Sequence, residues 1–286
     1  MKVFITGSSG RLGRKITNYL IKKKIYCYCN YNKNYLKKKN SKFFIRYKKN
    51  IISKSFLMPL DIDVVCHLGN VTKGKSQKSL FTTNLKINKK IFEITKKHKK
   101  IKKIIYFSTV AIYGKKNRNT VNEKVNFFNE DLYAKSKYKS EKIFNKLKKI
   151  KIYNIRIPGV LGTGNEKNFL SNLIFNINKN IKVNLVNPKN LFNNVILVDT
   201  LCVFVLKLIK NNFKSGTIIL GSSKPITISK ITKIIIKLLK SKTKIFWKIE
   251  KQGFYLNILK AIKKYDFKPM TTTSVIKKYI KSEYLT

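Results

Sequence analysis

The first thirteen residues constrain the fold most, because a short apolar run leads directly into regularly spaced glycines. The run is Val3–Ile5, and an amphipathic segment over residues 12–20 follows the glycines. The glycines stand three residues apart: Gly7, Gly10 and Gly13. This order predicts a strand, a glycine turn and a helix. Glycine permits a positive φ and close approach of a ligand, and a helix start offers N–H groups to a phosphate. We expect a dinucleotide-binding turn here; a purely structural turn is the alternative.

Strand and helix signals alternate through the first half of the chain. Apolar runs predict further strands at residues 25–29, 43–47, 63–68, 103–108 and 151–156. Spaced apolar positions predict helices at residues 76–98 and 131–149. Repeated strand–helix units make right-handed crossovers, so the pattern predicts an α/β fold with a Rossmann-type, doubly wound parallel sheet.

The alternation becomes irregular after residue 157. Shorter segments follow, with helices expected at residues 168–177 and 227–239 and extended segments at 182–186, 195–198 and 216–220. We interpret residues 1–157 as a dinucleotide-binding domain. Residues 158–286 are expected to form a smaller C-terminal substrate-binding lobe, interleaved with the main sheet.

The charge of the chain is extreme, at +52 from 64 basic and 12 acidic residues. A nucleic-acid partner is the first interpretation of such a charge. However, only five of the basic residues are arginine, and the lysines are spread over the whole chain. Lys, Asn, Ile, Tyr and Phe share A/T-rich codons, so base composition accounts for the excess. We expect no specific nucleic-acid partner, although weak nonspecific binding stays open.

Neither membrane insertion nor metal binding is expected. No apolar run approaches the roughly 20 residues of a membrane helix, and we find no signal peptide. The four cysteines lack a Cys-x-x-Cys arrangement, which favours reduced core thiols in a cytoplasmic protein. With two histidines and scattered carboxylates, the sequence predicts no metal site.

Two later segments carry candidate chemistry. Tyr133 and Lys137 are four residues apart on a predicted helix and therefore share a face. An adjacent ammonium favours the phenolate of a tyrosine, which could then exchange a proton with a hydroxyl. Chance is the alternative, since the same helix also contains Tyr138 and Lys142. The second segment begins Ser108-Thr109 at the end of a strand, where ligands bind in such sheets.

Together these segments resemble the extended short-chain dehydrogenase/reductase family, in its NAD(P)-dependent nucleotide-sugar epimerase/dehydratase branch. The glycine spacing matches that branch, and so do Thr109 five residues before Gly114 and Tyr133 24 residues after Thr109. Further similar segments are residues 63–68, Asn84, residues 156–164, residues 193–199 and residues 267–269. The resemblance therefore covers the whole chain.

The resemblance implies roles for individual residues. Tyr133 would be the acid/base, and Lys137 would lower its pKa and hold the cofactor ribose. Thr109 would hold the reacting oxygen, with Ser108 as the second choice. Cofactor contacts would come from Gly7, Ser9, Gly10, Arg11, Leu12, Gly13, Asn30, Leu68, Gly69, Tyr133, Lys137 and Pro158.

The implied activity is nucleotide-sugar 4-epimerisation or 4-keto reduction by hydride transfer, in surface-polysaccharide synthesis. Val110-Ala111 stands where dehydratases of the branch carry Asp-Glu, and Ala111 where decarboxylases carry Glu, which points away from both activities. Gly159 replaces an asparagine that contacts the diphosphate in many relatives. A reductase of a small carbonyl compound, a catalytically silent dinucleotide-binding protein and a nucleic-acid or acidic-surface binder are the alternatives.

The choice of cofactor and the oligomeric state are the finest expectations. The second strand ends without the acidic residue that binds the ribose of NAD. Asn30 does not repel a phosphate and Lys33 could pair with one, so the sequence slightly favours NADP over NAD. The resemblance also implies a possible homodimer through the helices at residues 76–98 and 131–149.

Overall fold

The computed structural model describes residues 1–32, 41–71, 76–114, 117–124, 131–164, 166–250 and 253–285. The chain forms two compact units. The first consists of Met1–Ile112, Asn129–Arg156 and Cys202–Ile218. The second consists of Tyr113–Phe128, Ile157–Leu201 and Ile219–Thr286. The domain boundary expected after residue 157 stays a prediction.

The first unit is built on a seven-stranded sheet. Its strands lie in the order β12-β7-β5-β4-β1-β2-β3. Their bounds are β1 Lys2–Thr6, β2 Tyr26–Tyr31, β3 Phe44–Lys48, β4 Val64–His67, β5 Lys103–Thr109, β7 Lys151–Ile157 and β12 Gly216–Ile219. The neighbours from β3 to β5 pair in parallel. The doubly wound α/β fold is therefore confirmed.

Apolar strands stabilise the centre of this sheet. In β1, Ile5 pairs with Cys29 of β2 on one side and with Cys66 of β4 on the other, and all three are fully buried. Such strands are apolar on both faces because helices cover both faces of a parallel sheet. All four cysteines are buried and none of them forms a disulfide, and burial raises the pKa of the Cys27 thiol to about 12.

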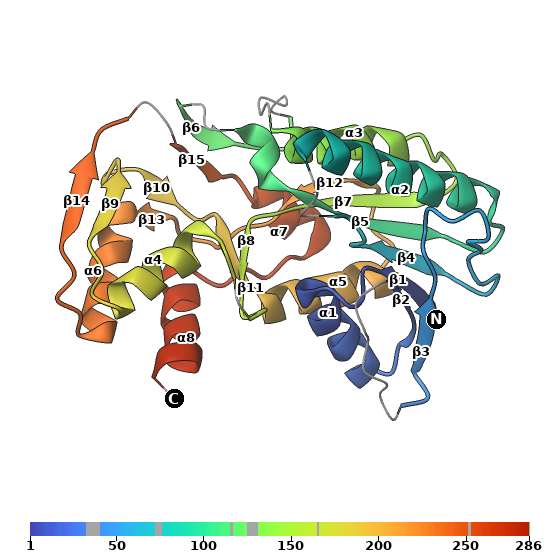
Figure 1. The fold of residues 1–286 in the computed structure, drawn as a ribbon, viewed down its shortest axis with the longest axis horizontal. Coiled ribbons are helices and arrows are strands. Elements are labelled where there is room, and N and C mark those ends of the chain that lie inside the picture. Colours follow the sequence, from blue (N-terminus) through green and yellow to red (C-terminus); the bar gives the residue numbers. More distant parts are fainter. Residues whose placement is uncertain are drawn as a thin grey trace. The chain divides into compact units, whose positions relative to one another are not determined.

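Helices cover both faces of the sheet (Figure 1), with α2 and α3 side by side on one face and α1 and α5 on the other. Their bounds are α1 Arg11–Lys22, α2 Gln77–Lys97, α3 Leu132–Phe144 and α5 Val198–Lys210. The sequence predicted that α3 continues to residue 149. The helix instead ends at Phe144, and Leu147 turns back so that its N–H donates to the Phe144 carbonyl at 3.0 Å. Leu147 is thereby buried against the sheet core.

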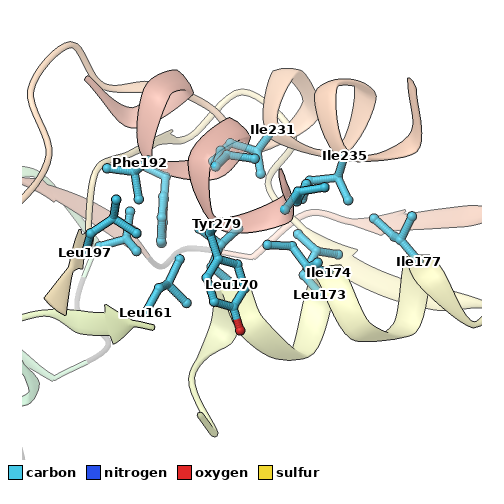
Figure 2. Packing of buried hydrophobic residues seen from close by; sticks show 14 of the residues in the cluster. Leu161, Leu170, Leu173, Ile174, Ile177, Phe192, Leu197, Ile231, Ile235 and Tyr279 are labelled. Atoms are coloured by element: carbon cyan, nitrogen blue, oxygen red, sulfur yellow. The ribbon is translucent and has the colours of Figure 1, made fainter. Parts of the chain in front are cut away.

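The second unit has its own hydrophobic core, formed largely by α4 (Phe169–Asn178), α6 (Ile228–Leu239) and α8 (Thr272–Tyr284). Figure 2 shows Leu173 and Ile174 of α4 beneath Ile231 and Ile235 of α6. The other elements are η1 Val110–Tyr113, β6 Asn117–Val121, β8 Gly159–Leu161, β9 Val183–Val186, β10 Leu191–Phe192, β11 Val195–Leu197, β13 Ile226–Thr227, β14 Ile245–Lys248, β15 Gly253–Leu256 and α7 Leu259–Tyr265.

Sequence reasoning missed one pair of strands in this unit. The sequence pattern predicts no strand between residues 108 and 131, yet Asn117–Val121 form β6, which pairs in parallel with β15. The partner lies more than 130 residues away in the chain, at Gly253–Leu256, so local pattern gives no signal for the pairing. In the part of the chain that the structure describes, no helix has both the length and the apolarity that a membrane crossing requires.

Candidate active site

Two glycines of the N-terminal turn are required by the fold itself. Gly7 has φ +67°, and a Cβ on it would lie 2.9 Å from the Cα of Gly69. A Cβ on Gly13, in the first turn of α1, would lie only 2.1 Å from the carbonyl oxygen of Gly7. The helix can therefore pack against the turn only if residue 13 has no side chain.

Gly10 is different, because its backbone conformation is one that any residue adopts. It caps α1 with φ −68° and ψ 162°, and its N–H donates to the Gly7 carbonyl at 3.0 Å. A Cβ here would meet the Gly7 oxygen at 3.2 Å and nothing else within 4 Å. The start of α1 also has no side-chain cap and no acidic residue in its first turn. This open, uncapped helix start fits a phosphate group.

The other cofactor residues of this turn lie at the same helix start. Ser9 is buried just before Gly10, and Arg11 and Leu12 are the first two residues of α1. Arg14 fixes the turn from the helix, since its Nε donates to the Ser9 carbonyl at 2.9 Å. The predicted group Ser9, Gly10, Arg11, Leu12 and Gly13 is thus one continuous segment at the junction of turn and helix.

Asn30, at the end of β2, is buried and ties three segments together. Its carbonyl accepts from Ser8 N at 3.1 Å and from Ser8 Oγ at 2.8 Å. Its side-chain nitrogen donates to the carbonyls of Tyr47 at 3.2 Å and Lys49 at 2.9 Å. Both amide hydrogens are thereby committed to the chain. Lys33, the other residue that the sequence singled out for the cofactor, lies outside the described residues.

Leu68 and Gly69 follow β4 directly beside the glycine turn. Gly69 N donates to Thr6 Oγ1 at 2.8 Å, which holds the two strand ends together. Asn84 of α2 fixes the continuation of this segment. Its Oδ1 accepts from Val71 N at 2.7 Å, and its Nδ2 donates to the Val71 carbonyl at 3.0 Å.

A buried row of hydrogen bonds begins at the helix α3. Ser140 Oγ donates to the Ser136 carbonyl at 2.8 Å, so it must accept the 2.6 Å hydrogen bond that joins it to Asn88 Nδ2. The Oδ1 of Asn88 therefore faces His67, whose Nε2 lies 2.5 Å away and must carry the proton. All four residues are essentially inaccessible to solvent.

The row ends at the glycine turn. Burial lowers the pKa of His67 to about 3, so its ring is neutral and Nδ1 has no proton. Nδ1 then accepts from Thr6 Oγ1 at 2.6 Å, while the same oxygen accepts from Gly69 N. A single directed series of hydrogen bonds thus connects the end of β1 and the segment after β4 with the helix that carries Tyr133.

Tyr133 and Lys137 share one face of α3, as predicted. Asp131 caps the helix, with its Oδ1 accepting from Tyr133 N at 2.7 Å. The Lys137 Nζ donates to the Phe107 carbonyl at 2.7 Å and lies 5.7 Å from the centroid of the Tyr133 ring. The lysine is fully sequestered between helix and sheet.

The charge states of this pair differ from the sequence expectation. Burial, with a smaller contribution from Asp131, raises the pKa of Tyr133 to about 12. Burial lowers the pKa of Lys137 to about 7, and the carboxylate of Glu141 opposes that change. From the sequence, the adjacent ammonium was expected to favour the phenolate of Tyr133. In the folded chain alone, loss of solvent contributes more than the charge of the neighbour.

The two hydroxyls at the end of β5 differ in their exposure and in their hydrogen-bond partners. Ser108 is 1% exposed, and its Oγ donates to Glu141 Oε1 at 2.5 Å. Thr109 is only half-buried, and its Oγ1 accepts from Ala111 N at 3.1 Å. Thr109 is thus the hydroxyl at the open end of the strand, whereas Ser108 is turned into the unit.

A buried ion pair near this site was not predicted. Arg156 of β7 donates from Nε to Glu141 Oε1 at 3.0 Å and from Nη2 to Oε2 at 2.7 Å. Glu141 follows Lys137 by four residues, which places both on one helix face, and that spacing was the available signal. The arginine gave no comparable signal, because the pairing of β7 with α3 is tertiary.

Pro158 is the predicted cofactor residue that falls in the second unit, where it is buried at the start of that unit's segment 157–201. Gly159 follows, with its N–H donating to the Asn194 carbonyl at 3.1 Å. A Cβ at residue 159 would lie 3.2 Å from Cγ of Asn168. The remaining predicted site residues all belong to the first unit. Within the described ranges, no three His, Cys, Asp or Glu side chains gather as they would around a metal ion.

The family model of the NAD dependent epimerase/dehydratase family matches residues 3–201 of this chain. The chain belongs to this family, as the glycine turn and the Tyr133–Lys137 helix predicted. None of the curated protein sequences compared with the chain matches it significantly.

Solved structures show the same fold at low sequence identity. UDP-glucuronic acid 4-epimerase from Bacillus cereus, in complex with NAD, is 21% identical with a TM-score of 0.79, over 99% of this chain and 100% of that chain. The Bordetella bronchiseptica enzyme WbmH, in complex with NAD+, is 16% identical with a TM-score of 0.80, over 99% of each chain. UDP-glucose 4-epimerase from Thermotoga maritima, with UDP-glucose, is 17% identical with a TM-score of 0.76, over 98% of each chain.

Proposed function

We propose that this chain is an NAD(P)-dependent nucleotide-sugar 4-epimerase or 4-keto reductase that acts in surface-polysaccharide synthesis. One observation supports it above the others: Lys137 Nζ is held at 2.7 Å by the Phe107 carbonyl and lies beside the ring of Tyr133. Family membership and the similarity to two solved UDP-sugar 4-epimerases agree with this arrangement.

The glycine turn fits the diphosphate of the cofactor. Gly10 leaves open space at an uncapped helix start, so the N–H groups of Arg11 and Leu12 are placed where an anion binds. Bound NAD(P) supplies the hydride acceptor and donor and, when oxidised, a positive charge. The task of the chain is to hold the sugar hydroxyl and to move its proton.

Tyr133 is the proposed acid/base. Its pKa of about 12 must fall to near neutrality, which requires about 7 kcal/mol of differential stabilisation at 1.36 kcal/mol per unit. The ammonium form of Lys137 contributes to that stabilisation. Thr109 would hold the reacting oxygen while the proton passes to the phenolate oxygen of Tyr133.

The chain offers a matched pair of variants for the test. Tyr133→Phe removes the proposed acid/base, whereas Tyr138→Phe removes a tyrosine of the same helix whose partner is Lys142, 4.8 Å from its ring centroid. We expect Tyr133→Phe to lose at least about a hundredfold in kcat, within the usual contribution of acid–base catalysis. Tyr138→Phe should keep the activity of the unchanged chain.

The assay follows UDP-, GDP- and dTDP-sugars by NMR of their anomeric signals. Epimerisation should proceed without added cofactor once the protein is loaded, whereas 4-keto reduction consumes one NAD(P)H for each product. If Tyr133→Phe keeps most of its turnover, the acid/base lies elsewhere. Binding of NAD(P) without turnover of any sugar, but with reduction of small aldehydes, would favour the small-carbonyl reductase instead.

For the cofactor we propose NAD rather than the NADP that the sequence slightly favoured. Both amide hydrogens of Asn30 are committed to the carbonyls of Tyr47 and Lys49, so this side chain has no donor left for a 2′-phosphate. Two of the similar solved structures contain NAD.

We also propose a homodimer through α2 and α3. Sedimentation or light scattering would measure the mass of the protein in solution.

A further inference from the structure

Glu141 has no task in the proposed chemistry, yet its buried carboxylate accepts hydrogen bonds from two side chains. It is 2% exposed and lies one turn after Lys137 on α3. Its Oε1 accepts from Ser108 Oγ at 2.5 Å and from Arg156 Nε at 3.0 Å, and its Oε2 accepts from Arg156 Nη2 at 2.7 Å. Three donors thus hold one carboxylate in place.

Stability alone is a poor reason for such a pair. The side chains of Arg156 and Glu141 are 4% and 3% exposed, so both charges have lost their water. The desolvation of a buried ion pair offsets much of its attraction, and apolar replacements of similar volume are often neutral or stabilising. We therefore look for the role of the ion pair in the residues that surround it.

Lys137 is the neighbour that needs a negative charge. It is buried, at 4% exposed, and the Phe107 carbonyl that accepts its hydrogen bond carries no charge. The groups that face it are Tyr133 on its own helix, Tyr106 of β5 with a ring centroid 5.1 Å from Nζ, and His67 of β4. These three are neutral near pH 7, because burial raises the pKa of both tyrosines and lowers that of His67. Glu141 supplies the opposing charge.

We propose that Ser108 and Arg156 hold Glu141 as a buried anion that favours the ammonium form of Lys137, so that Glu141 is a positioning residue for the Tyr133 proton transfer. The inference rests on the proposed function for its catalytic consequence. It also gives Ser108 a task other than touching the substrate. Arg156 contacts both carboxylate oxygens of Glu141 and supplies the positive charge that pairs with it in the buried site.

The direct test measures the charge of Lys137 without any substrate. In protein labelled with [13Cε]lysine, one resonance should titrate near pH 7 and be missing from Lys137→Met, because the pKa of this lysine lies far below that of exposed lysines. In Glu141→Gln, which keeps the shape and still accepts hydrogen bonds, we expect that midpoint to fall by about one pH unit or more. Glu93→Gln, an exposed residue of α2, is the control and should leave the midpoint unchanged.

Two outcomes decide the inference. A Glu141→Gln midpoint equal to that of the unchanged chain would overturn it, whether or not the protein turns over a sugar. If Glu141→Gln does not fold because Arg156 loses its carboxylate partner, the double variant Glu141→Gln with Arg156→Gln replaces it. The double variant also lacks the carboxylate, so its Lys137 midpoint must likewise fall below that of the unchanged chain, and an unchanged midpoint would overturn the inference.

The catalytic consequence has its own signature. With Lys137 neutral, the phenolate of Tyr133 loses support, so the acidic limb of kcat against pH should move to higher pH and activity should recover in alkali. The KM of the sugar and the dissociation constant of the cofactor should change less than about twofold. A loss of kcat that is equal at every pH would indicate a merely structural role. Absence of all turnover, with the lysine shift intact, would refute the proposed function and leave the effect of Glu141 on Lys137 standing.

Discussion

Gly10 and Gly13 allow the fold requirement of the N-terminal turn to be separated from its ligand requirement. Each glycine would be changed to alanine in a separate variant. Each variant adds one methyl group, and the two positions are three residues apart in the same turn. The methyl of Gly13→Ala would lie 2.1 Å from the Gly7 carbonyl oxygen, whereas the methyl of Gly10→Ala would lie 3.2 Å from it. The two variants should therefore fail in different ways.

The magnitudes follow from the two distances. Since real Cβ atoms essentially never approach closer than 3.0 Å, Gly13→Ala must displace α1 from the turn by 3.0 − 2.1 = 0.9 Å or more. Overpacking of this kind destabilises by about 3 kcal/mol, which lowers Tm by about 6–12 °C in a chain of this size. Gly10→Ala has an ordinary φ of −68° and reduces the freedom of the unfolded chain, so its stability should stay within about 1 kcal/mol.

Gly10→Ala, the variant of near-normal stability, is the one that should lose affinity for the cofactor. The methyl of Gly10→Ala would occupy the open space at the helix start, so we expect the affinity for NAD(P) to fall at least about tenfold, or 1.4 kcal/mol. Thermal unfolding gives the stability, and isothermal titration with NAD and NADP gives the affinity. A Gly10→Ala protein of normal stability that binds the cofactor as tightly as the unchanged chain would refute the placement of the diphosphate at this turn.

Two further predictions concern His67 and the choice of cofactor. Because the pKa of His67 is lowered to about 3 in the folded state, the unfolded chain takes up a proton that the folded chain refuses. Its contribution to stability is present above about pH 6.5 and is lost as the pH falls, by about 3 kcal/mol at pH 4.5. Denaturant unfolding measures this. The free energy of unfolding of His67→Gln should fall less between pH 6.5 and 4.5 than that of the unchanged chain. An equal fall in both proteins would contradict the lowered pKa of His67. For the cofactor, titration should give a dissociation constant at least about tenfold lower for NAD than for NADP, since Asn30 has no free donor; tighter NADP would contradict this.

The sequence was most informative where one local pattern dictates one local structure. Gly7 and Gly13 specify the turn, because a left-handed residue and a close helix approach both exclude side chains. The alternation of apolar runs specified the doubly wound sheet. Tyr133 and Lys137 share a helix face because their spacing permits nothing else once the segment is helical.

Tertiary contacts account for what the sequence did not predict. The helix signal continues past Phe144, but the chain must turn there so that Leu147 packs into the core before β7. Which of Ser108 and Thr109 holds the reacting oxygen depends on the direction in which β5 orients each side chain. The hydrogen bond from Ser108 to Glu141, a residue of another element, turns Ser108 into the unit. The commitment of Asn30 to the end of β3 likewise has no counterpart in its own neighbourhood.

The directed row of hydrogen bonds through His67 gives this protein an internal spectroscopic probe. With only two histidines in 286 residues, the imidazole signals can be assigned by a single substitution. His67 is buried and its Nε2 lies 2.5 Å from Asn88 Oδ1, so the proton on Nε2 should exchange slowly with solvent and resonate far downfield. Its signal exists only while β4, α2 and the neutral tautomer are all in place. Loss of that one resonance during unfolding, or its shift when NAD(P) is added, would report directly on the contact between the glycine turn and the helix of Tyr133.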